Sequence, residues 1–185
     1  MPTPFRADNI GSLLRPAELI EARAAQRENR ITPAELRVIE DRSILQALAL
    51  QRSAGVDVFT DGEYRRGNFM ADFTNSLDGM VPSETIMAPI WRGPNRGLAS
   101  EFRRSDSESV VGAKLRKKTD GVFGAEAAFL KQHAPASFKV CVPSVAQFAD
   151  SKFKPGATDR AYPTRRAMVQ DFAALLRDED RKSVV

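Results

Sequence analysis

The segment from Thr32 to Thr60 constrains the fold more than any other part of the sequence. It begins with Thr32-Pro33-Ala34-Glu35, in which a threonine N-cap, a proline at the first helical position and a later glutamate form a capping box. An apolar side continues to Ala54, and Gly55 stands where helices commonly end. Val56-Asp57-Val58-Phe59-Thr60 then predicts a short strand. A helix, a short turn and a strand are typical of parallel α/β folds.

The remaining sequence repeats this alternation of strand and helix. The predicted strands are Phe5–Ile10, Val56–Thr60, Ser109–Leu115 and Phe138–Val142, and the other predicted helices begin at Pro16, Gly124 and Pro163. Residues 83–108 hold clusters of Pro and Gly, and we interpret them as a long excursion, for which a hairpin is one form. We therefore expect about four strand-plus-helix units in one domain over residues 1–185, which is half of a complete eightfold barrel of about 250 residues.

The composition argues against two classes of protein, membrane proteins and nucleic-acid-binding proteins. The sequence has no stretch of about 18 uninterrupted apolar residues and no apolar signal core near its start, so we expect no membrane segment and a cytoplasmic location. Its 28 Lys and Arg against 24 Asp and Glu leave a net charge of only +4, and the basic cluster Lys114–Lys118 lacks interleaved aromatic residues, so we expect no nucleic-acid partner.

One cysteine and one histidine limit the metal chemistry. Cys141 lies in an apolar predicted strand, which favours a packing role over a nucleophilic one. His133 lies near a predicted helix end, which favours a structural role over that of a catalytic base. A zinc site built from Cys and His in the usual way needs more such ligands within one chain, so we assign no metal ligand.

The first candidate binding motif is Asp8-Asn9-Ile10-Gly11-Ser12, at the end of the first predicted strand. Backbone N–H groups around Gly11 and the hydroxyl of Ser12 can bind a carboxylate or a phosphate. A purely structural strand-to-helix turn explains the same residues.

The second candidate motif is Asp61-Gly62-Glu63-Tyr64-Arg65-Arg66, which follows the second predicted strand. In parallel barrels the carboxyl ends of the strands form the site. A carboxylate there can bind an ammonium group, and an arginine can hold a carboxylate. The alternative is a solvated charged loop. A third candidate, Pro143-Ser144 with Gln147 and Phe148, follows the last predicted strand and is either a pocket wall or a structural turn.

Together these motifs resemble those of the cobalamin-independent methionine synthase family. Ile10-Gly11-Ser12-Leu13-Leu14-Arg15-Pro16 is similar to its first strand-to-helix segment, and Asp61-Gly62-Glu63-x-Arg65-Arg66 to its second. Lys139-x-x-x-Pro143-Ser144 is similar to its fourth-strand segment. The Leu-Leu-Arg-Pro form is more similar to the single-barrel members. The resemblance runs from about residue 5 to 176, with 83–108 poorly matched.

The resemblance implies a (β/α)8 TIM barrel that transfers a methyl or alkyl group to a zinc-activated thiolate such as that of homocysteine, as in methionine biosynthesis, with a methyl-folate as a possible donor. It implies that Ile10, Gly11 and Ser12 contact the amino-acid part of the thiol substrate and that Glu63 binds its ammonium group. It leaves Asp8, Asp61, Arg65 and Ser144 as further pocket residues.

The sequence departs from the family where the family's zinc ligands lie. It contains no His-x-Cys motif, and the polar run from Arg177 to Ser183 stands where the family continues into a strand with an acidic residue. The resemblance therefore implies the N-terminal half of a methionine-synthase-like methyltransferase, truncated near residue 177. We expect this chain to have no catalytic residue of its own, no bound zinc and no activity alone.

Two other hypotheses remain open. A half barrel leaves strand edges and apolar surface uncovered, so the chain would self-associate as a homo-oligomer or pair with a separate second half as a non-catalytic module. A related barrel such as uroporphyrinogen decarboxylase is the weaker alternative, because the Gly-Ser and Asp-Gly-Glu motifs argue against it.

Overall fold

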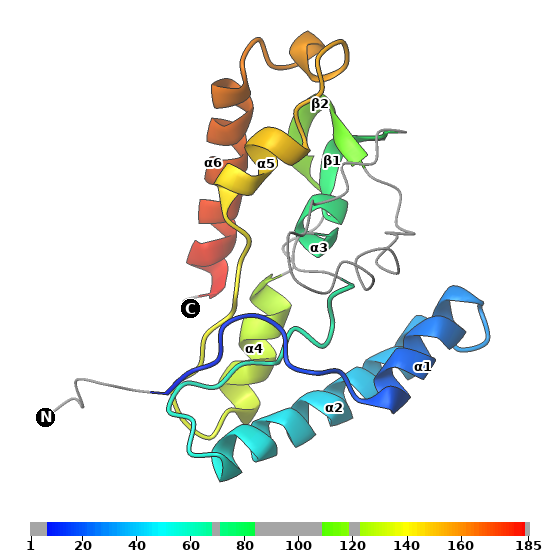
Figure 1. Ribbon diagram of the computed structural model, residues 1–185, viewed down its shortest axis with the longest axis vertical. Coiled ribbons are helices and arrows are strands. Elements are labelled where there is room, and N and C mark those ends of the chain that lie inside the picture. The colour runs from blue at the N-terminus through cyan, green and yellow to red at the C-terminus, as the bar shows by residue number, and fades with distance from the viewer. Residues whose placement is uncertain (1–6, 68–70, 84–108, 119–122, 184–185) are drawn as a thin grey trace, which may run out of the picture. The chain divides into compact units, whose positions relative to one another are not determined.

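The computed structural model describes residues 7–67, 71–83, 109–118 and 123–183, which divide into two compact units (Figure 1). Unit 1 takes the described residues within Met1–Phe73, Gly121–Pro143 and Glu179–Val185, and unit 2 takes those within Thr74–Asp120 and Ser144–Asp178. Of the predicted excursion at 83–108, only Ser83 lies among the described residues.

Unit 1 contains the helices α1 (Ala17–Arg27), α2 (Pro33–Ser53) and α4 (Phe123–His133), and α1 and α2 lie side by side in Figure 1. The prediction for α2 is confirmed at both ends. The Thr32 side chain accepts a hydrogen bond from the Glu35 N–H and the Glu35 carboxylate accepts one from the Thr32 N–H, which completes the capping box. Gly55 follows the helix with φ +73°, a left-handed conformation that glycine adopts without strain.

Three short extended segments of unit 1 run parallel to one another. Asp8 forms a parallel bridge with Val58, and Phe59 forms one with Phe138. Backbone hydrogen bonds support both, since Asp57 N–H donates to Ala7 O at 2.8 Å and Phe59 N–H donates to Ser137 O at 2.9 Å. The middle segment, 56–60, therefore lies between the other two, and all three point their carboxyl ends the same way.

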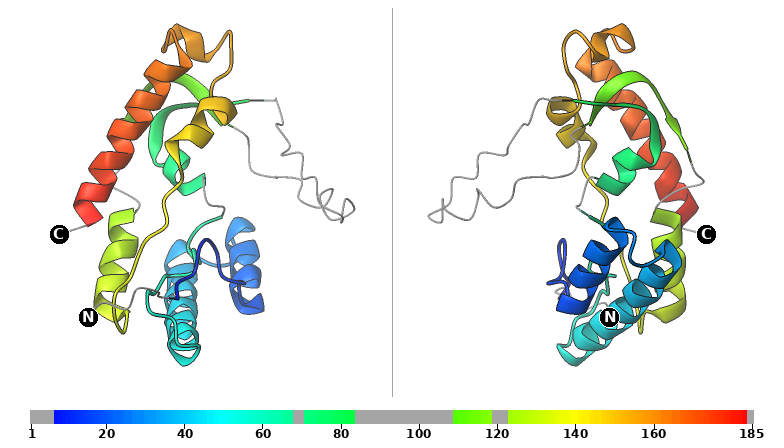
Figure 2. Two further views of the ribbon diagram at one scale, coloured as in Figure 1. Left: turned by 60° about the vertical axis from the view of Figure 1, so that its left-hand side comes forward. Right: turned by 90° about the vertical axis from the view of Figure 1, so that its right-hand side faces the viewer.

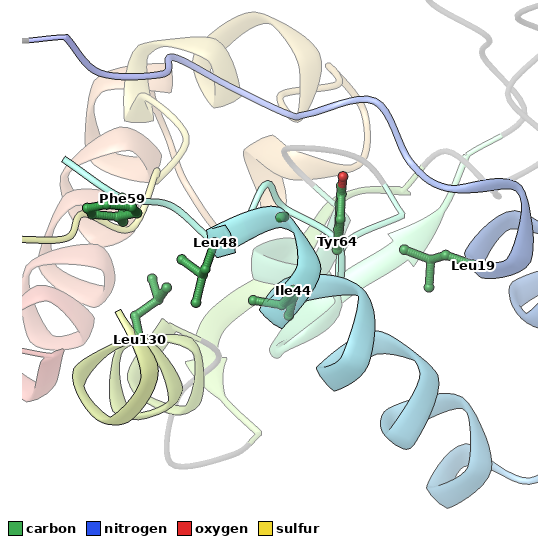
Figure 3. Close-up of a cluster of buried hydrophobic side chains, with 7 residues drawn as sticks. Leu19, Ile44, Leu48, Phe59, Tyr64 and Leu130 are labelled. Atoms are coloured by element: carbon green, nitrogen blue, oxygen red, sulfur yellow. The ribbon is translucent and has the colours of Figure 1, made fainter. Parts of the chain in front are cut away.

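A single apolar cluster joins these segments to the helices of unit 1 (Figure 3). Its buried members are Leu19 of α1, Ile44, Ala47 and Leu48 of α2, Phe59, Tyr64 and Leu130 of α4. Leu19, Ile44 and Leu130 are completely buried. Because the cluster includes Phe59 and Tyr64, it fixes both the middle segment and the loop that follows it.

Unit 2 is built on an antiparallel pair of strands, β1 (Leu77–Pro82) and β2 (Ser109–Lys117), and also contains α5 (Val145–Ser151), the 3₁₀ turn η2 (Thr158–Arg160) and most of α6 (Arg165–Ser183). The short helix α3 (Ala71–Asn75) precedes β1. Figure 2 shows β2 beside α6 in both views. The Tyr162 hydroxyl connects them, since it accepts a hydrogen bond from Leu115 N–H at 2.9 Å and donates one to Asp171 at 2.7 Å.

The pairing of β2 corrects the expected role of Ser109–Leu115. This segment was predicted as a strand of the parallel set, but it pairs antiparallel with β1. Gly79, with φ +92°, permits the close approach, because a Cβ there would lie 2.7 Å from Lys114 O. The count of four parallel strand-plus-helix units is therefore not confirmed; the described residues contain three bridged parallel segments. None of the described helices combines the length and hydropathy that a membrane-crossing segment requires.

Candidate functional site

The candidate site is formed by the two loops that follow the first and middle parallel segments, residues 10–15 and 61–66. Both loops leave the same end of the segments, because the Asp8–Val58 bridge is parallel. The buried Gln51 amide fixes the start of the second loop, since its Oε1 accepts from Thr60 N–H at 2.9 Å and its Nε2 donates to Thr60 O at 2.8 Å. Gln51 Oε1 also accepts from the Asn9 side chain at 3.3 Å, which connects the two loops' starting points.

The second loop begins with a tight turn at Asp61-Gly62-Glu63. Gly62 has φ +66° and Glu63 has φ +57°, so two successive residues are in the left-handed region. For a non-glycine residue this conformation costs roughly 1–2 kcal/mol. The Asp61 carboxylate supports the turn, because its Oδ1 accepts a hydrogen bond from Glu63 N–H at 3.0 Å.

The turn places the Glu63 side chain against the first loop. Ser12 Oγ donates a hydrogen bond to Glu63 Oε2 at 2.6 Å, and Leu13 N–H donates to Gly62 O at 3.1 Å. Glu63 is only 4% exposed, whereas Ser12 lies at the surface. The structure thus brings together two of the residues that the sequence motifs singled out, although they are 51 positions apart.

Two arginines from outside this turn bind its main-chain carbonyls. Arg15 Nη2 donates to Glu63 O at 3.1 Å and to Arg66 O at 3.0 Å, and Arg23 donates to Tyr64 O. Arg66 itself donates to Cys141 O at 2.6 Å, which ties the turn to the third parallel segment. Because these carbonyls are held by charged donors, the turn has a fixed backbone.

Buried charge surrounds the turn on its inner side. Arg66 is 1% exposed and pairs with the buried Glu126 of α4. Burial opposes the charge of Arg66, but hydrogen bonding to Glu126 and the carboxylates of Glu126, Asp61 and Glu63 together raise its pKa. Asp61 is 2% exposed, and its Oδ2 atom has no hydrogen-bond partner among the described residues.

The other predicted site residues have separate surroundings. Ile10 is 91% exposed, and Gly11 has φ +80° with open space where a Cβ would stand. Asp8 pairs with Lys139 at 2.5 Å. Arg65 pairs with Asp41 of α2, and its guanidinium carbon lies 4.3 Å from the Phe129 ring centroid.

Ser144 belongs to unit 2. It caps the N-terminus of α5 by accepting a hydrogen bond from Ala146 N–H at 3.4 Å. That contact agrees with the structural-turn interpretation of Pro143-Ser144.

Sequence reasoning missed the residues that hold the turn in place. The turn or its ends are contacted from 9 or more positions away by Arg15, Arg23, Gln51 and Glu126. Arg15 is part of the motif that carried the resemblance, but neither its spacing nor its type indicates that it binds carbonyls. Glu126 lies 60 positions from Arg66, so only the tertiary structure pairs them.

The described residues do not fit a zinc site. They contain no group of three or more His, Cys, Asp or Glu side chains that could hold a metal ion. The His133 ring packs against Phe129 with the ring centroids 4.4 Å apart, and the main-chain carbonyl of Cys141 accepts from Arg66.

The arrangement suits recognition of a small molecule that carries both charges. A buried carboxylate at Glu63 can bind an ammonium group. Beside it, the N–H groups of the Gly11-Ser12 segment can bind a carboxylate, whereas the Ser12 hydroxyl already donates its proton to Glu63. An α-amino acid has both groups on one carbon atom.

Comparison with known proteins adds three findings. Residues 5–89 match the sequence profile of the family described as the catalytic domain of cobalamin-independent synthases. An uncharacterized protein of Bacillus subtilis, YxjH, is 44% identical over 79 residues, which are 43% of this chain and 21% of that protein. The 5-methyltetrahydropteroyltriglutamate–homocysteine methyltransferase of Thermosynechococcus vestitus is 31% identical over 81 residues, which are 44% of this chain and 11% of that enzyme.

A solved structure extends the likeness at the level of the fold. The B12-independent methionine synthase of a Shewanella species, in complex with selenomethionine, superposes with a TM-score of 0.64 at 22% sequence identity. The superposition covers 83% of this chain and 40% of that one. The chain therefore shares the fold of part of a TIM-barrel-like protein, and its matches span about a fifth or less of the curated relatives.

Proposed function

We propose that this chain supplies the part of a methyltransferase site that binds the amino-acid portion of a thiol substrate such as homocysteine. The match of residues 5–89 to the catalytic-domain profile of cobalamin-independent synthases and the similarity to a homocysteine methyltransferase support this proposal. In this proposal Glu63 binds the ammonium group, and the backbone of Ile10 and Gly11 with Ser12 binds the carboxylate. A methyl-folate is the proposed donor, in keeping with the name of the Thermosynechococcus relative. The chain represents the N-terminal portion of such a transferase.

The hydrogen bond between Ser12 Oγ and Glu63 Oε2 is the observation that carries this proposal. It joins the two motifs of the resemblance at 2.6 Å and fixes a buried carboxylate beside Gly11. A buried carboxylate is costly unless it is paired, and the Glu63 carboxylate has the Ser12 hydroxyl as a donor and the Arg66 charge nearby, which Asp61 and Glu126 share. An ammonium group would give it a cationic partner of its own. The methionine analogue named with the Shewanella structure has such a group.

The test measures binding of L-methionine and of N-acetyl-L-methionine to the 185-residue chain by titration calorimetry. We expect L-methionine to bind at least about tenfold more tightly, because acetylation removes the ammonium group that Glu63 would hold. The substitution E63Q should abolish that preference. E21Q is the matched control, because Glu21 is an exposed residue of α1. Equal affinities for the two ligands would contradict the proposal.

Methyl transfer itself is expected to need residues beyond those of this chain. The mechanism that the resemblance implies uses a substrate thiolate that zinc activates as the nucleophile. The described residues contain no cluster of side chains that could hold the zinc ion. We expect the purified chain to transfer no methyl group from a methyl-folate to homocysteine, with or without added zinc. Turnover by this chain, stimulated by zinc, would show that the division of the site is wrong.

The second candidate function is a non-catalytic module that self-associates or pairs with a separate second half. The observation in its favour is apolar exposure next to the ends of the parallel segments: Ile10 is 91%, Leu14 94% and Val142 49% exposed. Exposed side chains of this size favour burial against another chain. Light scattering should then detect a discrete dimer, and the double variant I10S/L14S should dissociate more readily. A chain that stays monomeric at all concentrations would exclude self-association.

A further inference from the structure

Glu63 must remain in an uncommon backbone conformation for its carboxylate to stay beside Ser12. Its φ of +57° lies in the left-handed region, and the preceding Gly62 has φ +66°. A glycine bears this without strain, but a glutamate does so only when neighbouring contacts outweigh the cost.

The Asp61 carboxylate accepts from Glu63 N–H, and Arg15 binds the carbonyl of the same residue. The Arg15 Nη2 atom donates to the carbonyl of Glu63 at 3.1 Å and to the carbonyl of Arg66 at 3.0 Å. The same Glu63 carbonyl accepts from Arg66 N–H at 3.2 Å, which closes the turn. One guanidinium nitrogen therefore holds both ends of the Glu63–Arg66 turn.

The partners of Arg15 distinguish it from the other arginines of the site. Arg23 pairs with Glu40, Arg65 with Asp41 and Arg66 with Glu126. Among the described residues, Arg15 binds only main-chain carbonyls and no carboxylate. Its charged hydrogen bonds thus act on the backbone conformation itself rather than on a neighbouring acid.

The first loop contributes a second connection to the same turn. The Tyr64 hydroxyl donates to Leu14 O at 2.8 Å, and Figure 3 shows this hydroxyl directed away from the apolar cluster. Leu13 N–H donates to Gly62 O at 3.1 Å. These bonds fix Leu13 and Leu14, and so they fix the point from which Arg15 reaches the turn.

We propose that Arg15 is a positioning residue, which holds the Glu63–Arg66 turn in the conformation that keeps the Glu63 carboxylate ready for an amino-acid ammonium group. The effect on ligand affinity rests on the function proposed above. The effect on the turn does not, because it concerns only the hydrogen bonds of the free protein.

The experiment combines amide hydrogen exchange with calorimetric titration of L-methionine on the full 185-residue chain. R15M keeps a side chain of similar length but removes the donors, and R15K keeps a charged donor. R52M is the matched control, because Arg52 is exposed in the last turn of α2. The amides of Glu63 and Arg66 report on the turn, and those of α2 report on the fold.

We expect R15M to speed exchange at Glu63 and Arg66, with α2 still protected, and to weaken L-methionine binding about tenfold. R15K should restore most of both properties, and R52M should change neither. Unchanged exchange at Glu63 and Arg66 in R15M would overturn the proposal. Weaker binding with unchanged exchange would also overturn it, because Arg15 would then act on the ligand directly.

Two further outcomes separate this proposal from the function on which it rests. If the wild-type chain binds no L-methionine, the proposed function is wrong. The exchange rates of Glu63 and Arg66 then decide by themselves whether Arg15 fixes the conformation of the turn. If R15M loses protection in α2 as well, R15Q replaces it, because glutamine keeps a polar head but is too short to reach both carbonyls. Unchanged exchange at Glu63 in R15Q would again overturn the proposal.

Discussion

Gly62 is the residue on which the shape of the candidate site depends most directly. Its φ of +66° is strained for most residues that have a Cβ, and side-chain atoms of Leu13 and Tyr64 occupy the space around it. A Cβ at this position would lie 3.1 Å from Leu13 Cβ and 3.1 Å from the Tyr64 ring. The Asp-Gly-Glu motif is therefore explained by backbone geometry as well as by the chemistry of its acids.

We predict that G62A destabilises the chain by roughly 1–3 kcal/mol, because it adds both left-handed strain and a steric conflict with Leu13. G67A is the matched control, since Gly67 has no positive φ and no atom within 4 Å of its added Cβ. Urea unfolding followed by circular dichroism measures both. Equal midpoints for the two variants would contradict the steric account.

At the residue scale, the sequence motifs singled out two side chains that the structure brings together. Ser12 and Glu63 were both assigned to substrate binding, and the structure places them in direct contact. Their binding roles stay predictions. Arg15 and Glu126 were not assigned, because their partners are 48 and 60 positions away and no local pattern identifies them.

Helix α2 is the element that the sequence specifies most completely. Its first turn is closed by reciprocal hydrogen bonds between Thr32 and Glu35. The Thr32 backbone N–H and, to a smaller extent, the Thr32 hydroxyl donate to the exposed Glu35 carboxylate and lower its pKa. Capping satisfies N–H groups that have no partner within the helix.

We predict that T32A lowers the free energy of unfolding by about 1 kcal/mol, whereas T32S, which keeps the capping hydroxyl, stays near the wild type. T32A should also move the pKa of Glu35 back toward its ordinary value, since the Thr32 side chain is the second cause of the shift. Thermal unfolding and a carboxyl-detected pH titration measure the two effects. A T32S variant as unstable as T32A would show that the hydroxyl is not the stabilising group.

The sequence did not predict how the strands pair with one another. The pattern of Ser109–Leu115 is correctly that of a strand, but alternation gives no information on whether its neighbour runs parallel or antiparallel. Gly79 was not recognised as the glycine that permits β1 to approach it. Strand identity is a local property, whereas strand pairing is set by tertiary contacts.

At the scale of the whole molecule, both units rely on a buried tyrosine whose hydroxyl bridges separate parts of the chain. Tyr64 in unit 1 donates to Leu14 O, and Tyr162 in unit 2 connects β2 with α6. Burial raises the pKa of Tyr64 and, together with the hydrogen bond to Asp171, raises the pKa of Tyr162 to about 12.

We predict that neither tyrosine ionises near pH 10 in the folded chain, which contains only these two. A folded-state pKa above the unfolded one gives stability that is present below pH 10 and lost as the pH rises toward about 12. Absorbance at the phenolate band, titrated in the folded chain and in denaturant, measures this. Phenolate formation at pH 10 in the folded chain would contradict the burial of both hydroxyls.

Unit 1 is assembled from three segments of the chain, with unit 2 sequence between them, and this order has a consequence for synthesis. The Asp8–Lys139 pair closes over 131 residues and Arg66–Glu126 over 60. At ribosomal speeds the earlier residue of the longer pair waits on the order of ten seconds for its counterpart. During that interval α1 and α2 can form, but Phe59 and Arg66 have neither Phe138 nor Glu126 to contact. The apolar core of the nascent chain therefore stays incomplete and exposed for a longer time than the chain length alone suggests. Chaperones that bind apolar segments can bind it most readily before residue 138 emerges.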